Sequence, residues 1–142
     1  MKKILVGLDG SPRADAVLAY AESLAQVTGA KLVLFRSFAI PPDLTLAWPA
    51  SDLSLEVALR TQARKYLDTC AGTLPRELLG GVRVDVGIPW RAVCGAALDE
   101  NVDLIVIGSH GYSGVDHVIG TTAARVVNHA DRSVLVVHNA GT

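Results

Sequence analysis

The sequence contains few of the residues that form disulfide bonds or structural metal sites. Only two of its 142 residues are cysteines, and Cys70 and Cys94 are too far apart to have the spacing of a metal-binding pair. We therefore expect two small thiols, buried or half-buried, of the kind that is usual in a reducing compartment.

Clusters of positive charge and long apolar segments are also absent. The formal net charge is −1, and the lysines and arginines are dispersed, which argues against binding to nucleic acid or to a membrane surface. The longest apolar runs are about six residues, too short to span a bilayer. The first six residues resemble the start of a signal peptide, but Asp9 interrupts the apolar run. We therefore expect a cytoplasmic protein.

The remaining composition is that of a folded protein. Hydrophobic residues make up 50% of the chain and charged residues 19%, which is enough apolar material for a full core and argues against disorder. A chain of 142 residues fits one domain, 1–142.

Hydrophobic periodicity divides the chain into alternating strands and helices. Short apolar segments predict strands at 4–8, 32–38, 82–86, 104–107 and 133–137. Helical spacing predicts helices at 12–28, 54–71, 89–101 and 123–130. For the first helix, Ser11 is a suitable N-cap, Pro12 suits the first helical position, and Gly29 ends the helix.

Strict alternation of this kind predicts an α/β fold with parallel strands and right-handed crossovers, in an open doubly wound sheet. Ligands of such sheets bind beyond the carboxyl ends of the strands, where the winding direction reverses. Asp9 follows the first strand, and a glycine-rich loop follows the fourth. Both features face one crevice if these two strands are neighbours, but the pattern alone does not give the strand order.

The glycine-rich loop between the fourth strand and the fourth helix is the most informative segment. Its small residues and the helix start that follows are Gly108, Ser109, Gly111, Gly114, Gly120, Thr121 and Thr122. Glycines allow close approach of the backbone to a phosphate, and the unpaired N–H groups of a helix start point toward it. The segment is therefore typical of an anion-binding site.

Several familiar phosphate-binding chemistries do not fit this chain. A Walker A loop needs a lysine, and none lies between Gly108 and Arg125. The spacing of Gly7 and Gly10 does not match the dinucleotide fingerprint of the first turn. A phospho-receiver would carry paired acids where Asp9 stands alone, and the first turn is not the Ser/Thr-rich loop that binds a flavin phosphate.

Four segments, in this order and spacing, resemble the universal stress protein family over the whole chain. They are Ile-Leu-Val-Gly-Leu-Asp-Gly-Ser at 4–11, Asp-Leu-Ile-Val-Ile-Gly-Ser-His-Gly at 103–111, Gly-Thr-Thr-Ala-Ala-Arg-Val-Val at 120–127 and Ser-Val-Leu-Val-Val at 133–137. The resemblance implies a five-stranded sheet of order 3-2-1-4-5. It also implies the branch that binds ATP or another adenine nucleotide through the motif Gly-x2-Gly-x9-Gly-Ser/Thr. The loop here is one residue shorter, since eight residues lie between Gly111 and Gly120.

The resemblance assigns roles to individual positions. Gly108 and Gly111 would wrap the ribose and phosphates, and Asp9 would contact the ribose or adenine. Ser109 and His110 belong to the same loop, and the position of His110 fits either an imidazole near the phosphates or one that faces solvent. The remaining residues that the resemblance implies are Gly7, Leu8 and Ser37 at the edge of the adenine pocket, Ile107 packed on it, and Gly120, Thr121 and Thr122 at the phosphates. Apart from the resemblance, Mg²⁺ could supply charge beside the nucleotide and Asp9 or Asp116 could hold it, although nothing in the sequence requires the ion. The family also implies a homodimer paired through the fifth strand.

Alternatives remain open at this stage. The glycine loop could serve only tight packing between strand and helix, and Asp9 could simply cap a turn. No nucleophile is paired with a base, no carboxylates are paired, and the glycine loop holds no lysine or arginine, so no catalytic residue is assigned. The functions that fit are a nucleotide-binding stress or signalling module, a weak ATP hydrolase or self-phosphorylating protein, and a dimeric scaffold that binds no nucleotide.

Overall fold

The structure is a computed structural model and describes residues 1–40, 52–109 and 120–138. Its strands are β1 (Lys3–Gly7), β2 (Lys31–Phe38), β3 (Leu79–Val86), β4 (Leu104–Gly108) and β5 (Ser133–Val137). Its helices are α1 (Ala14–Thr28), α3 (Asp52–Ala71), the 3-10 helix η1 (Arg76–Leu78), α4 (Pro89–Asp99) and α5 (Thr121–His129).

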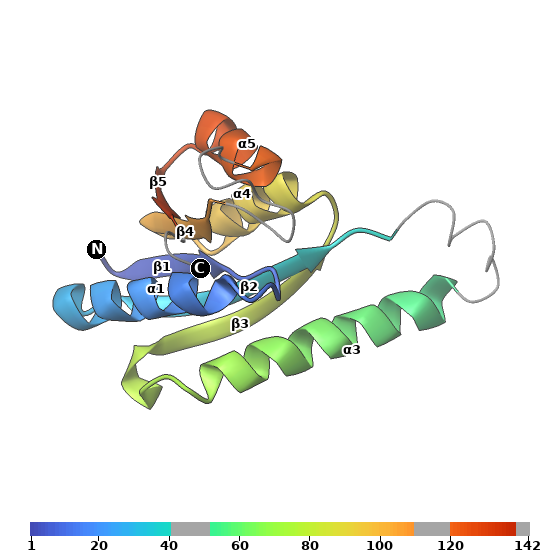
Figure 1. The fold of residues 1–142 in the computed structure, drawn as a ribbon, viewed down its shortest axis with the longest axis horizontal. Coiled ribbons are helices and arrows are strands. Elements are labelled where there is room, and N and C mark those ends of the chain that lie inside the picture. The colour runs from blue at the N-terminus through green and yellow to red at the C-terminus, as the bar shows by residue number, and fades with distance from the viewer. Residues whose placement is uncertain (41–51, 110–119, 139–142) are drawn as a thin grey trace.

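The five strands form one parallel sheet in the order β3-β2-β1-β4-β5 (Figure 1). The chain winds outward from β1 through β2 to β3, then returns to the other side of β1 for β4 and β5. The predicted fold class and the strand order implied by the family resemblance are both confirmed. Because β1 and β4 are paired, with Ile4 opposite Leu104, Asp9 and the segment after β4 follow neighbouring strands.

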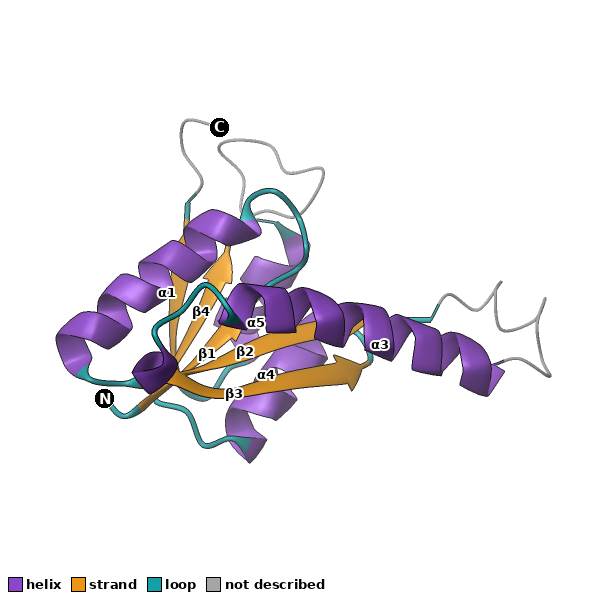
Figure 2. Ribbon diagram, turned by 90° about the horizontal axis from the view of Figure 1, so that it is seen from below, coloured by secondary structure: helices purple, strands orange, loops and turns teal. Residues whose placement is uncertain are grey.

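Each face of the sheet carries its own hydrophobic core. Ile4 and Val6 of β1 pack in the core beneath α1 and α3, whereas Leu5 between them packs in the core beneath α4 and α5. This alternation follows from the two-residue period of a strand. Figure 2 shows the result, with α1 and α3 on one side of the sheet and α4 and α5 on the other.

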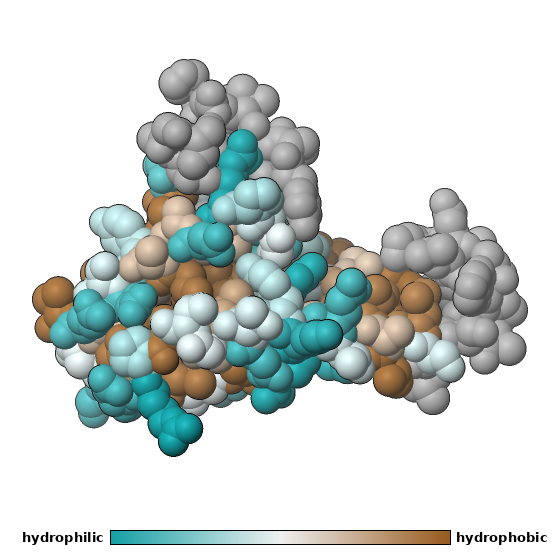
Figure 3. Space-filling view, turned by 60° about the horizontal axis from the view of Figure 1, so that its bottom comes forward, coloured by the Kyte–Doolittle hydropathy of each residue, from teal (hydrophilic) through white to brown (hydrophobic). Residues whose placement is uncertain are grey.

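The helix α3 is longer than the part of the sheet that it covers. It has 20 residues, and its first turns extend past the sheet (Figure 1). Ala63 and Leu67 are buried, whereas Val57 near the start is 54% exposed. Apolar side chains gather on the surface around the start of this helix (Figure 3). The second half of α3 therefore provides its attachment to the core.

Several element boundaries differ by one to three residues from the prediction, and two of these differences have a clear local cause. The helix α1 begins at Ala14 rather than at Pro12, because side chains first close a turn. The Asp9 carboxylate accepts the N–H of Ser11 at 2.9 Å, and the Ser11 hydroxyl accepts the N–H of Arg13 at 3.3 Å. The strand β3 begins at Leu79, three residues before the predicted start, because Gly80 and Gly81 interrupt the alternating pattern without ending the strand.

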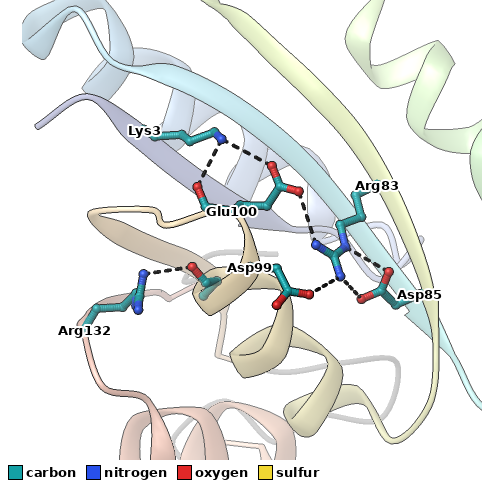
Figure 4. A network of polar contacts seen from close by, with 7 residues as sticks. Lys3, Arg83, Asp85, Asp99, Glu100 and Arg132 are labelled. Atoms are coloured by element: carbon teal, nitrogen blue, oxygen red, sulfur yellow. Dashed lines mark hydrogen bonds and ion pairs between the residues drawn. The ribbon is translucent and has the colours of Figure 1, made fainter.

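Charged residues replace apolar packing where α4 meets the edge strand β3. Arg83 contacts Asp85 at 2.9 Å, Asp99 at 2.9 Å and Glu100 at 3.2 Å, and Glu100 also pairs with Lys3 at 3.3 Å (Figure 4). The hydrogen bonds that Arg83 donates to Asp85, and then to Asp99, raise the pKa of Arg83 above its ordinary value. The network therefore ties the end of α4 to β3 and to the start of β1.

A second arginine closes the connection between α4 and β4. The Arg132 side chain is 15% exposed, and its Nη1 donates to the carbonyl of Ala97 at 2.8 Å and to that of Val102 at 3.0 Å. Figure 4 shows this side chain reaching back from the segment before β5. The two cysteines, Cys70 and Cys94, are free and half-buried, as expected.

Asp103 fixes the start of β1, and its role depends on charge. Its carboxylate accepts the N–H of Lys2 at 2.6 Å and that of Lys3 at 3.0 Å, and these bonds hold the pKa of Asp103 below its usual 3.8. A carboxylate with a lowered pKa in the folded state stabilises above its unfolded pKa, and the effect disappears as the pH falls through the folded pKa. We expect Asp103→Asn to melt below the wild-type protein at pH 7, with a difference that shrinks as the pH falls below 3.8 and vanishes below the lowered pKa of the folded state. Thermal melts in a pH series measure this, and an equal difference at every pH would refute it.

Two glycines test how backbone conformation affects stability here. A Cβ added at Gly95 in α4 or at Gly87 before α4 would meet nothing within 4 Å, but Gly87 has a φ of +149°. We expect Gly95→Ala to raise the free energy of unfolding by about 0.5–1 kcal/mol, because alanine favours the helix. Gly87→Ala should lower it by about 1 kcal/mol or more through backbone strain. Urea denaturation compares the two, and changes of the same sign would contradict this explanation.

Candidate functional site

A cavity of about 280 Å³ lies at the carboxyl ends of β1, β2 and β4. The first residues of α1, α4 and α5 complete its wall. This is the point where the winding of the sheet reverses, which is the usual ligand site of a doubly wound sheet. The volume is close to the lower end of the range, about 300 Å³, that is common for small-molecule sites.

Every expected binding residue that the structure describes lines this cavity. These residues are Gly7, Leu8, Asp9, Ser37, Ile107, Gly108, Ser109, Gly120, Thr121 and Thr122. His110 and Gly111 lie outside the described residues, as does Asp116. Residues that are separated by about a hundred positions in the sequence thus share one site.

The floor of the cavity is apolar and tightly packed. Phe35 and Ile107 are 1% and 5% exposed, and both line the cavity. A Cβ at Gly7 would approach the Cγ2 atom of Ile107 to 2.9 Å. Glycine at this position therefore allows Ile107 to lie against β1 below the cavity.

Asp9 caps the turn that follows β1. Its Oδ1 atom accepts the N–H of Ser11, and no other hydrogen bond to this carboxylate occurs within the described residues. Asp9 also remains exposed at the rim of the cavity. The turn-capping alternative is therefore observed, and the same carboxylate is placed where a ligand could reach it.

The start of α5 presents backbone donors to the cavity. Its N-cap residue is Gly120, and no side chain of the described chain caps this end. The N–H of Gly120 itself donates to the carbonyl of Ser109 at 2.6 Å. The donors open to a ligand are therefore those of the following residues, Thr121, Thr122 and Ala123, together with the exposed threonine hydroxyls.

Sequence reasoning missed the positive charge of the cavity. It searched the glycine loop, whereas Arg13 comes from the turn before α1 and Arg36 from β2. Within the described lining, Asp9 is the one acidic residue beside these two arginines. Arg36 directly precedes Ser37, which was expected at the site. Because ligands of doubly wound sheets bind at the carboxyl ends of the strands, the sequence could have identified Arg36 as well. Pro89 and Val93 of α4 were also missed, because their contact with the cavity depends on how α4 packs.

The described part of the chain shows neither a metal-binding cluster nor a membrane-spanning helix. No group of three or more His, Cys, Asp or Glu side chains there could hold a metal ion. None of the helices in those residues is long and apolar enough to cross a membrane.

Comparison with known proteins decides the family. The model of the universal stress protein family matches residues 1–138. The chain belongs to the universal stress protein family. Among relatives, it is 33% identical over 138 residues to the "Universal stress protein in QAH/OAS sulfhydrylase 3'region" of Thermus aquaticus, covering 96% of this chain and 98% of that protein. It is 30% identical to the universal stress protein Sll1388 of Synechocystis, covering 96% of this chain and 97% of the relative.

Solved structures of universal stress proteins share the fold. Hypothetical protein MJ0577 superposes with a TM-score of 0.82 at 24% identity, over 96% of this chain and 94% of that one. The universal stress protein UspA of Lactobacillus plantarum gives 0.74 at 27%, over 96% and 97%. A universal stress protein in complex with cAMP gives 0.63 at 22%, over 96% of both chains.

Proposed function

We propose that the chain is a universal stress protein that binds ATP or another adenine nucleotide in this cavity. It would act as a stress-response or signalling module in the cytoplasm, in which the bound nucleotide alters conformation or partner choice. The observation that carries the proposal is the meeting of three features at one cavity. These are an apolar floor for a base, an uncapped start of α5 and a net positive wall.

The chemistry of the wall suits an adenylate. Phe35 and Ile107 offer apolar contact to a purine ring, and the exposed Asp9 carboxylate can accept a hydrogen bond from a ribose hydroxyl. The N–H groups at the start of α5 and the hydroxyls of Thr121 and Thr122 supply donors to phosphate without a lysine. The relative in complex with cAMP supports an adenine nucleotide as the ligand class.

The same wall does not favour rapid phosphoryl transfer. Asp9 is the one carboxylate of the described lining, and it already accepts the N–H of Ser11. Efficient transfer needs a positioned water or hydroxyl together with neutralised charge. Mg²⁺ at Asp9 would supply charge but no base. We therefore propose slow ATP hydrolysis at most. The test measures ADP release at saturating ATP. A rate equal to that in buffer without protein would favour a nucleotide-binding module over an ATP hydrolase.

The edge strand β5 is the proposed dimer interface. Val134, Leu135 and Val136 are half-buried on a strand that pairs only with β4 in the described chain. Unpaired apolar edges of this kind invite pairing with another chain. Sedimentation is expected to show a dimer at micromolar concentration, and a monomer there would remove this part of the proposal.

The binding proposal is tested directly on the purified full chain. Denaturing the protein and separating the supernatant by chromatography would reveal carried-over adenine nucleotide. Calorimetry with ATP, ADP, AMP and cAMP then gives affinities, and we expect saturable binding of at least one of them. No heat from any of these ligands at millimolar concentration would reject the nucleotide site and leave the scaffold alternative.

A further inference from the structure

Arg36 is a half-buried arginine in the wall of the cavity. Leu32 and Leu34 of β2 point into the core beneath α1 and α3, so the two-residue period places Arg36 on that same face, at the carboxyl end of the strand. Its guanidinium therefore lies where α3, the turn before α1 and the cavity meet.

Two neighbours hold the guanidinium in place. Its Cζ atom lies 4.9 Å from the centroid of the Tyr66 ring, which is a favourable cation–π distance. On another side it packs against Gly10, where an added Cβ would approach Nη1 to 2.6 Å. Gly10 has a φ of +77°, a conformation that favours glycine, so this turn leaves space for the arginine head.

The Tyr66 ring is itself anchored. Burial, together with its hydrogen-bonded neighbour Cys70, raises the pKa of the Tyr66 hydroxyl, so the ring stays neutral at physiological pH. The guanidinium of Arg36 therefore packs against a neutral ring, and Tyr66 does not neutralise its positive charge.

Unlike Arg83 and Arg64, Arg36 has no acid partner among the described residues. Arg83 contacts three carboxylates, and Arg64 pairs with Asp68 at 3.0 Å. Across residues 1–40, 52–109 and 120–138, the Arg36 guanidinium forms no hydrogen bond or ion pair, and its contacts are the Tyr66 ring and Gly10. A guanidinium carries five N–H donors, and a half-buried cation is unfavourable when these donors lack an acceptor. Because the group lines the cavity, a ligand can supply that acceptor.

The arginine and the start of α5 lie on opposite sides of β1. Arg36 belongs to β2, and α5 follows β4, while β1 pairs with both strands. Two strand spacings separate β2 from β4, which is about 10 Å. The cavity therefore has two groups that attract anions, and they are too far apart to hold the same phosphate oxygen.

We propose that Arg36 forms a second anion subsite, so that the preferred ligand carries two separated negative groups. One group lies at the start of α5 and the other is a phosphate at Arg36. This inference rests on the proposed adenine-nucleotide site and specifies its ligand. The second phosphate belongs either to the distal end of a 5′-polyphosphate chain or to the ribose 2′- or 3′-hydroxyl.

Calorimetry on the wild-type chain and on Arg36→Gln tests the subsite with AMP, ATP and adenosine 3′,5′-bisphosphate. Loss of a charge-assisted, bidentate contact is expected to weaken at least one of the two larger ligands by about 10- to 100-fold. The affinity for AMP should change by less than about 3-fold, because its single phosphate is held at α5. A selective loss for ATP identifies the polyphosphate end, and a selective loss for the bisphosphate identifies the ribose phosphate.

Two further variants control this experiment. Arg64→Gln makes the same change in net charge on the exposed surface of α3 and should leave all three affinities unchanged. Arg36→Lys keeps the charge and should recover part of the loss. Melting temperatures of all variants verify the fold.

The outcomes separate this inference from the function on which it rests. If Arg36→Gln weakens AMP as much as the larger ligands, or changes none of them, the subsite is refuted while the nucleotide site stands. If the wild-type chain binds none of the three, the nucleotide site itself is refuted, and the subsite with it.

Discussion

Gly120→Val is expected to weaken adenine-nucleotide binding by at least about 100-fold while leaving the fold intact. Gly120 has a φ of −63° and a ψ of 161°, an extended conformation that a β-branched residue adopts readily. The new side chain would stand beside the N–H groups of Thr121 and Thr122, where an anion must approach to about 3 Å. Losing two charge-assisted hydrogen bonds of about 1.5 kcal/mol each accounts for the expected factor.

Calorimetry measures the affinity, and circular dichroism measures the melting temperature. Gly81→Val is a matched control, because Gly81 lies in β3, outside the cavity lining, and a Cβ there would meet nothing within 4 Å. The control should bind nucleotide as the wild-type chain does. Normal binding by Gly120→Val would show that the anion lies elsewhere than at the start of α5.

The architecture was predictable because its signals are local. Each strand is a short apolar run that is bounded by turn residues, and each helix shows its own periodicity, so the alternation of β and α can be read directly from the sequence. The order of the strands could not be read in this way. It depends on which faces pack together across the whole chain, and only the family resemblance supplied it. The pairing of Ile4 with Leu104 has no local signal in either segment.

The residues of the site also fall into a group that the sequence predicted and a group that it missed. Residues expected from motifs, such as Asp9, Gly108 and Thr121, do line one cavity. The arginines were missed because the prediction searched for cations within the glycine loop, where other phosphate-binding proteins carry them. Arg36 reaches the cavity only because β2 lies beside β1, and Gly10 and Tyr66 hold it there. A side chain that is positioned by three separate elements leaves no pattern in any one of them.

The turn after β1 shows how a correct residue type can give a wrong boundary. Ser11 was expected to cap a helix that starts at Pro12, and its hydroxyl does accept a backbone N–H, that of Arg13. The bond closes a turn in place of the first helical turn, because Asp9 already holds the N–H of Ser11. Asp9 and Ser11 therefore act together to form the turn at the rim of the cavity, and α1 begins two residues later than predicted.

Phe35→Ala is expected to cause the largest loss of stability among single substitutions near the cavity, about 3–5 kcal/mol in the free energy of unfolding. Phe35 is 1% exposed and is among the largest fully buried side chains of the described chain. It lies in β2 opposite Gly7 of β1 and packs in the core beneath α4 and α5. Because Phe35 also lines the cavity, water can enter part of the space that it leaves, which favours the lower end of this range.

Urea denaturation measures this loss, with Val27→Ala as the control, since Val27 is 85% exposed and its truncation should change stability by less than about 0.5 kcal/mol. The same variant also tests the floor of the proposed site. Nucleotide at 100 times its dissociation constant should stabilise the wild-type chain by about 2.7 kcal/mol. If Phe35 supports the purine ring, the same nucleotide concentration will stabilise Phe35→Ala by less. Equal stabilisation of both proteins would show that the base binds away from β2, and the floor would then have a purely structural role.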